Sequence, residues 1–453
     1  MLAHASRWLR EGAPSRVLPY RVHRLLERWT AEGAYPRAGV LLGVRGPATA
    51  EPQAHILFGG DLALHRIGTT APETLFAGVK DTLSRADLRV VNLETQLIAD
   101  RPPAGTIGSF LRADPGALGV LRSLRIDAVT CANNHSMDFG PEGLAESVDR
   151  LRQAGIRVTG VLGGLETAVV EAGGLRVGLA AFADDWHFHG DHAAVGPVPH
   201  GPDRVRGAID ALRRSADVVV VQLHWGYEYS MHPMCGLRDL ARSYVDAGAD
   251  LVVCHHAHVP MGVERWGRGI IAHGLGNFYF GPARRSHPFT SRSFLLRIGL
   301  AREGVTNAEL VPVRTDTSGC IRSEAADRDN STLRAIGFLS EAIGDTRYLS
   351  AVEDRLLLRE GARILVDLSD RLGREDLDGA RQRVAFLGPP RQRFLLAWLR
   401  NADELSRSIG DLLERLYAGP DVVTTQAMEQ EIHGLATQAR HRVEAMPQLG
   451  RLP

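Results

Sequence analysis

Between residues 53 and 318, short apolar runs alternate with stretches that have helical periodicity. The runs include HILFGGD, LRVVNLE, DAVTCANNH, DVVVVQLHW and DLVVCHH, and the helical stretches include PEGLAESVDRLRQAG and LRDLARSYVDAGA. This alternation is typical of α/β folds, because each strand and the helix that follows it cover one another. The segment TAVVEAGGLRVGLAAF has Gly-Gly between two apolar runs, which predicts a hairpin and therefore a mixed sheet.

The two ends of the chain have a different texture. Residues 1–50 are predicted to form a helical N-terminal extension that ends in a loop rich in Gly, Pro and Ala. From 321 to 453, apolar residues recur at helical spacing with almost no strand signal, which predicts a helical C-terminal domain. We expect this domain to cover the α/β domain (51–320) or to form a homodimer. The alternative is a lid over the substrate.

Composition and charge exclude several classes of partner. Lysine plus arginine and aspartate plus glutamate both number 53, so the formal net charge is zero and gives no general attraction to nucleic acid or anionic membrane. The N-terminus has no continuous apolar region typical of a signal peptide, and no apolar run is long enough to span a bilayer. The four cysteines show no CxxC spacing and are expected to be buried free thiols. We therefore expect a cytoplasmic protein that binds neither nucleic acid nor membrane.

Polar side chains suited to metal binding occur where five of the apolar runs end. They are Asp61, Asn92, Glu94, Asn134, His135, Asp138, His224, His255, His256 and His258. A single residue of this kind is more often part of a capped turn or a structural hydrogen bond. Five strand ends with the same chemistry indicate a site, since functional residues of α/β sheets collect at the carboxyl ends of strands. The mixture of oxygen and nitrogen ligands suits Mn, Fe or Zn, and it suits Ca if the histidines act through water.

Six motifs in this region resemble, in order, those of the CapA/PgsA family of poly-γ-glutamate synthesis proteins. They are GGDLALHR, VVNLE, ANNHSMDFGPEGL, LHWGYEY, DAGADLVVCHHAHVPMGVERW and GLGNF, within residues 55–281. That family is similar to the calcineurin-like metallophosphoesterases, so the resemblance implies a two-sheet sandwich flanked by helices. It also implies a divalent metal ion held by Glu94, Asn134, His224, His256 and His258.

The same resemblance assigns the acid–base groups. Asp61 matches the first aspartate of the family, and His135 resembles the histidine that acts on the reacting oxygen in phosphoesterases. Asp138 would orient His135, because a histidine needs a partner that fixes its tautomer. His255 matches no ligand of the family and is expected to pack or to form a structural hydrogen bond.

Two positions depart from the pattern of the superfamily. Its first motif is Asp-x-His, whereas this chain has Asp61, Leu62 and Ala63. One of the two usual metal positions is therefore expected to be weak or empty, which weakens the case for two-metal hydrolysis. The second departure is His273, where a tyrosine is expected. It either adds a titratable group near the site or is an ordinary strand residue.

Further polar residues are candidates for the rim of the site. His187 and His189 lie in the loop FADDWHFHGDHAAVG, and Arg66 and Glu228 lie within the motifs GGDLALHR and LHWGYEY. These residues are either polar surface or substrate-binding groups. Because the arginine fork binds both oxygens of a carboxylate, we expect a peptide or a small carboxylate-bearing substrate.

Three functions remain open on this basis. The preferred one is Cα epimerisation of a residue in a ribosomally made precursor peptide, because soluble CapA-like proteins of lasso-peptide pathways resemble this chain and are epimerases. His135 with Asp138 would face Asp61 and one of His258 or His273 across the Cα, so that one pair removes the proton and the other returns it. The alternative is a metal-dependent hydrolase of phosphoester or amide bonds. A component of capsule polymer synthesis comes third.

Overall fold

The computed structural model describes residues 44–45, 51–67, 71–104, 109–184, 195–283, 288–324 and 331–353, together with 356, 409, 412 and 426–445. Contacts divide the chain into one unit of Pro19–Thr346 and another of Met1–Leu18 with Arg347–Pro453. Of the predicted N-terminal extension, only Val44–Arg45 (β1) lies within the described residues. All of the candidate site residues that are described belong to the larger unit.

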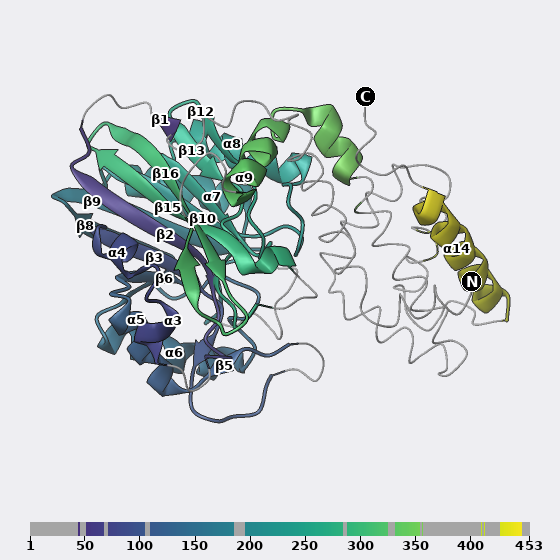
Figure 1. Cartoon of the computed structure of the whole chain (residues 1–453), viewed down its shortest axis with the longest axis horizontal. Helices are drawn as coiled ribbons and strands as arrows, with labels where there is room; N and C mark the ends of the chain where they lie inside the picture. Colours follow the sequence, from purple (N-terminus) through teal and green to yellow (C-terminus); the bar gives the residue numbers. More distant parts are fainter. Residues whose placement is uncertain are drawn as a thin grey trace. The chain divides into compact units, whose positions relative to one another are not determined.

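Two β-sheets form the centre of the larger unit (Figure 1). The first has the order β1-β16-β15-β2-β3-β6-β7, with β14 paired to β2 and β17 paired to β16. Its strands are β2 (Ala54–Leu62), β3 (Leu88–Leu93), β6 (Ala128–Thr130), β7 (Arg157–Thr159), β14 (Asn277–Tyr279), β15 (Arg292–Ala301), β16 (Gly304–Thr315) and β17 (Ile321–Ser323). A separate short pair joins β4 (Gln96–Leu97) to β5 (Arg112–Ala113).

The second sheet has the order β12-β13-β11-β10-β9-β8. Its strands are β8 (Thr167–Ala172), β9 (Leu175–Ala183), β10 (Val218–His224), β11 (Leu251–His255), β12 (Val263–Trp266) and β13 (Gly269–Ala272). β8 and β9 pair antiparallel around Gly173 and Gly174, whose φ angles of 55° and 76° are ones that glycine adopts readily. The predicted hairpin and the mixed sheet are therefore confirmed.

Helices cover the outer faces of the two sheets. They are α3 (Pro72–Leu75), α4 (Lys80–Ser84), α5 (Leu118–Ser123) and α6 (Gly140–Gln153) in the first half of the unit, and α7 (Pro202–Arg213) and α8 (Cys235–Asp246) in the second. Figure 1 shows α3, α5 and α6 gathered on one flank. The predicted architecture, a two-sheet sandwich flanked by helices, is confirmed.

The alternation of residues along β10 shows how the core positions the site. Val218 and Val220 belong to the apolar cluster between the two sheets, whereas Val219, Val221 and Leu223 pack beneath α7 and α8. Because successive side chains of a strand point to opposite faces, the next two inward positions belong to Gln222 and His224. The inner layer of the sandwich thus changes from apolar to polar at the carboxyl end of the strand.

Helix α9 (Ser331–Ala342) packs within the larger unit, although the sequence places it in the helical C-terminal domain. Ser340 Oγ accepts a hydrogen bond of 2.9 Å from the backbone of Val263 in β12, and the Arg238 guanidinium donates to the carbonyl of Ile343 over 3.1 Å. In the smaller unit, the structure describes α14 (Gln426–Ala445). Across the described ranges, no helix combines the length and the apolar character that crossing a bilayer requires.

Candidate metal centre

The site forms where parallel strands of both sheets end. Asp61 in β2 lies in register with Asn92 in β3, and His224 in β10 lies in register with His255 in β11. After β11 the chain turns sharply, with positive φ angles of 88° at His256 and 58° at His258. Positive φ is uncommon for residues other than glycine and often accompanies function. Both sheets therefore supply side chains to one place.

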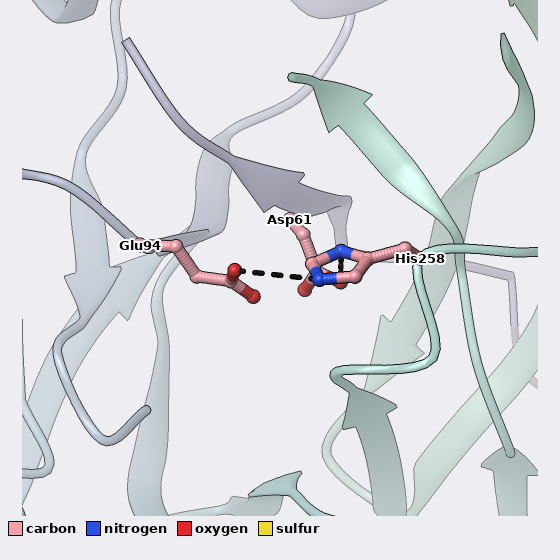
Figure 2. Close-up of side chains that lie close together, drawn as sticks. All are labelled: Asp61, Glu94 and His258. Carbon is pink, nitrogen blue, oxygen red and sulfur yellow. Dashed lines mark ion pairs between the residues drawn. The ribbon is translucent and has the colours of Figure 1, made fainter. Parts of the chain in front are cut away.

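Asp61, Glu94 and His258 form the centre of this site. One ligand atom from each lies within 4.8 Å of the others, and all three residues are buried. His258 Nδ1 is 3.2 Å from Asp61 Oδ2, and its Nε2 is 3.9 Å from Glu94 Oε2, so that the imidazole reaches both carboxylates (Figure 2). Asn277 Oδ1 lies 2.9 Å from His258 Nδ1. An Nδ1–H donated to Asn277 leaves Nε2 as the metal-binding atom, an arrangement common to ligating histidines.

A second group of ligand atoms surrounds His224. Its Nε2 lies 2.8 Å from Asn134 Oδ1, and its Nδ1 lies 3.5 Å from Glu94 Oε1. The rings of His224 and His256 are 4.7 Å apart between centroids. Burial holds the pKa of His224 well below its usual value, so the ring is neutral near pH 7. A neutral imidazole is the form that binds a metal ion.

The charges of the centre fit a bound cation. Burial, and then the charge of Asp61, raise the pKa of Glu94 well above its usual value. Burial alone would raise the pKa of Asp61 as well, but His255 and His258 outweigh it, and this pKa lies well below its usual value. Burial would lower the pKa of His258, but Glu94 and Asp61 raise it to about 10. Glu94 Oε2 is buried and makes no hydrogen bond with the described residues.

Two buried carboxylates that share one site repel each other unless positive charge lies between them. The unbonded oxygen of Glu94 and the mixture of carboxylate, amide and imidazole donors therefore fit a divalent cation.

Three asparagines organise the site; the sequence placed Asn92 among the candidate polar side chains without a specific role, and it did not single out Asn133 or Asn277. Asn92 Nδ2 lies 2.9 Å from both Asp61 Oδ1 and Glu94 Oε1 and stands between the two carboxylates. Asn133 Nδ2 donates to Asn92 Oδ1 over 3.2 Å and so joins the loop after β6 to β3. Asn277 is the third. The spacing of Asn92, in β3, and Glu94, just after it, two residues apart, was a signal that both side chains share a face.

His135 and Asp138 form a pair beside the metal ligands. His135 Nδ1 lies 2.8 Å from Asp138 Oδ2, and the same oxygen accepts a 2.7 Å hydrogen bond from the backbone of Leu111. Asp138 is fully buried, whereas 12% of the His135 side chain is exposed. Asp138 therefore fixes the imidazole with Nδ1–H toward itself, which leaves Nε2 for a substrate.

The other predicted residues lie in varied settings. His273 Nε2 is 2.9 Å from Glu264, which also binds Arg242, and none of the contacts of His273 with described residues reaches the metal ligands. Arg66 is exposed on the turn after β2. Glu228 is also exposed, and its charge raises the pKa of both Glu94 and His258, so it lies near the centre. His187 and His189 lie outside the described residues.

Three curated proteins show the kind of relative that this chain has. It is 28% identical over 269 residues to "PGA biosynthesis protein CapA" of Bacillus subtilis, and the alignment covers 58% of this chain and 67% of that protein. It is 29% identical over 214 residues to "Capsule biosynthesis protein CapA" of Bacillus anthracis, and that alignment covers 45% of this chain and 51% of that protein. It is 30% identical over 208 residues to a "Probable polyglutamine synthesis accessory protein" of Mycobacterium tuberculosis, and that alignment covers 42% of this chain and 55% of that protein. The chain thus spans about half to two thirds of the length of these relatives.

Two solved structures resemble the fold at low identity. A "novel phosphatase" of Mycoplasma pneumoniae has a TM-score of 0.40 at 12% identity, over 59% of this chain and 95% of that one. A "5'-nucleotidase" of Candida albicans has a TM-score of 0.36 at 12% identity, over 68% of this chain and 60% of that one. Likeness at this level does not bear on activity.

One family description matches the part of the chain that forms the site. Residues 55–282 match "Bacterial capsule synthesis protein PGA_cap". This segment is half of the chain, and it includes Asp61, Glu94, the His135–Asp138 pair and every histidine around the centre. The chain therefore belongs to the PGA_cap family of bacterial capsule synthesis proteins.

Proposed function

We propose that this protein is a divalent-metal-dependent hydrolase of phosphoester or amide bonds. The observation that carries the proposal is the gathering of Asp61, Glu94 and His258 within 4.8 Å in a buried site. The His135–Asp138 pair lies beside the ligands, because His135 directly follows Asn134, whose Oδ1 is 2.8 Å from His224 Nε2. Metal ligands and one oriented acid–base group are the parts that metal-assisted hydrolysis needs.

The ligands for the metal come from both sheets. They would be Asp61, Glu94, Asn134, His224, His256 and His258. A divalent cation in this place would supply Lewis-acid polarisation of a carbonyl or phosphoryl oxygen. Its identity is among Mn, Fe, Zn and Ca, since the donor set suits the first three and a water-mediated set suits the last.

The His135–Asp138 pair supplies the proton transfer. With Nδ1–H held by Asp138 over 2.8 Å, Nε2 of His135 is the atom that exchanges a proton with the substrate. Water forms the new bond to the carbonyl or phosphoryl centre as the substrate bond breaks, a protonated Nε2 gives its proton to the leaving oxygen or nitrogen, and the proton that the water loses returns to Nε2. Asp138 stays charged and stabilises the imidazolium before that transfer.

Epimerisation, the function preferred from sequence, requires a second base on the opposite face of the Cα. Of the candidates for that base, His273 is bonded to Glu264, and Asp61 and His258 belong to the metal cluster. A second base would therefore have to come from the cluster itself. Hydrolysis requires the single His135–Asp138 pair, so we rank it above epimerisation.

The relatives narrow the substrate class. Their names refer to PGA, capsule and polyglutamine synthesis, so we propose a carboxylate-rich peptide or polymer as substrate. Exposed Arg66 would bind a substrate carboxylate with its two-pronged guanidinium. Exposed Glu228 carries the opposite charge and would favour a neutral or cationic group at its side of the site.

A combined assay tests the proposal. Gently purified protein is first analysed for bound metal. It is then incubated in deuterated water with bis-p-nitrophenyl phosphate, γ-glutamyl p-nitroanilide and a poly-γ-glutamate oligomer. We expect metal-dependent release of nitrophenol, nitroaniline or shortened oligomer, with no deuterium at Cα. His135→Ala should lower the rate about 10²–10⁴-fold without loss of metal, and Asp138→Asn should lower it less.

Two results would overturn the proposal. Deuterium at Cα with no bond cleaved would establish epimerisation instead. Absence of metal, together with activity that survives exhaustive chelation, would remove the metal from the mechanism.

A further inference from the structure

His255 occupies a buried position beside the centre that the family pattern leaves without a role. It is the last residue of β11, its side chain is 1% exposed, and its Nδ1 lies 3.2 Å from Asp61 Oδ1. Neither ring nitrogen makes a hydrogen bond with the described residues. Nδ1 has Asp61 as its neighbour, so Nε2 is the atom that lacks the partner a buried imidazole nearly always has, and a bound species would supply it.

The two oxygens of Asp61 have matching surroundings. Oδ2 lies 3.2 Å from His258 Nδ1 and accepts a hydrogen bond from the backbone N–H of His256. Oδ1 lies 3.2 Å from His255 Nδ1 and accepts a hydrogen bond from Asn92. The carboxylate therefore has an imidazole at each oxygen. The ring of His258 is also held by Asn277, whereas among the described side chains the ring of His255 is held by Asp61 alone.

A second observation points to the same region. Gln222 is 1% exposed, and neither its amide oxygen nor its amide nitrogen makes a hydrogen bond with the described residues. It lies on the inward face of β10, two residues before His224, and its register partner Val253 lies two residues before His255. Adjacent strands thus present unmatched polar side chains on the same face. Buried amides of this kind indicate a polar occupant.

The first motif bears on the role of His255. By the resemblance described above, Ala63 stands where the related phosphoesterases have the histidine of Asp-x-His, so an ion at Asp61 would lack that nitrogen ligand. We infer that His255 is a metal ligand on the Oδ1 side of Asp61, that it takes over the role of the missing imidazole, and that the centre binds two ions. This inference rests on the metal centre of the proposed function and assigns to it a residue from a different strand.

Metal titration tests this role without any catalytic assay. Metal-free protein is titrated with Mn²⁺ by calorimetry, and pulsed EPR counts the imidazole nitrogens that are coupled to the bound ions. Four proteins are compared: wild type, His255→Gln, the double variant Ala63→His with His255→Gln, and the control His200→Gln. The control removes a half-buried histidine that is bonded to Tyr244 rather than to the centre.

We expect two ions per chain in wild type, with nitrogens of His224, His255, His256 and His258 coupled to them. His255→Gln should lower the affinity for one of the two ions by more than about 100-fold. This is more than the loss that follows from changing a residue that only contacts a ligand. The variant should also show one coupled nitrogen fewer than wild type. The double variant should regain the affinity for the second ion and the fourth coupled nitrogen. The control should have the same stoichiometry, affinity and nitrogen count as wild type.

The outcomes separate the two proposals. If wild type binds no Mn²⁺, the metal centre itself is wrong. If wild type binds Mn²⁺ and His255→Gln keeps the same stoichiometry and nitrogen count, the centre stands and the role of His255 is wrong. If His255→Gln does not fold, the nitrogen count of wild type decides: four coupled imidazoles would support the ligand set that includes His255, and three would overturn that set of four.

Discussion

Replacing Glu94 with glutamine is expected to stabilise the metal-free protein and to abolish most of its stabilisation by metal. The side chain of Glu94 is fully buried, and its Oε2 makes no hydrogen bond with the described residues. Burial and the neighbouring charge of Asp61 raise its pKa well above the usual value. Glutamine keeps the shape and removes the charge, so it relieves the repulsion and also removes a ligand.

The size of the effect follows from proton linkage. Below pH 4.5, the usual pKa of this carboxyl, it is protonated in both folded and unfolded protein, and the two proteins should be equally stable. As the pH rises above that value, the unfolded chain loses the proton first. Wild type then loses about 1.4 kcal/mol per pH unit relative to the variant. By pH 7 the difference reaches at most about 3 kcal/mol.

Urea unfolding, followed by circular dichroism, measures this difference. In chelator at pH 7 the variant should be the more stable protein, and at pH 4.5 the two should coincide. Mn²⁺ at 100 times its dissociation constant should stabilise wild type by about 2.7 kcal/mol and the variant by much less. A variant that is no more stable than wild type in chelator at pH 7, or that gains equally from Mn²⁺, would refute the reasoning.

Three further predictions concern the surroundings of the centre. Asn277→Ala should lower metal affinity by about 10- to 100-fold, because Asn277 Oδ1 holds His258 Nδ1 at 2.9 Å; unchanged affinity in calorimetry would contradict this. Burial lowers the pKa of His200 from 6.5 to about 4, so wild type should lose up to about 3 kcal/mol on acidification between these values. His200→Gln should remove this loss, and identical pH profiles would disprove it. Gly60→Ala should destabilise the protein by about 3 kcal/mol or more, because the new Cβ would stand 1.8 Å from the carbonyl oxygen of Gly276; an unchanged melting temperature would count against this packing.

The parts of the site that the sequence predicts are those fixed by strand geometry alone. Parallel strands bring their carboxyl ends to one edge, so the apolar runs that end in Asp61, Glu94 and His224 were enough to predict that these residues converge. Gly-Gly between two apolar runs was enough for the hairpin of β8 and β9. In each case a local pattern determines the outcome.

Other contacts depend on pairings that no local pattern contains. His273 follows β13, and the antiparallel pairing of β12 with β13 brings it to Glu264 rather than to the centre. Asn277 reaches His258 because β14 pairs with β2 of the other sheet. Strand alternation places a side chain on a face, but it does not name the neighbour that the side chain meets there. The role of His255 was missed for the same reason.

The boundary of the C-terminal domain shows a similar limit. Helix α9 has the same helical texture as the sequence after it, yet it packs closely on Gly262, where an added Cβ would lie 2.7 Å from the backbone of Leu339. The change from strand-like to helical periodicity marks where the strands end. It does not show whether the helix that follows packs on the preceding domain.

β14 gives the centre a mechanical property. The chain leaves β13 in the second sheet and, a few residues later, pairs as β14 with β2 in the first, while the ligands themselves are divided between the two sheets. A bound ion would therefore cross-link the two sheets. Any shift of one sheet relative to the other would then change the distances between the ligands. Substitutions in the inter-sheet core, for example at Phe294, would then change metal preference without altering a ligand.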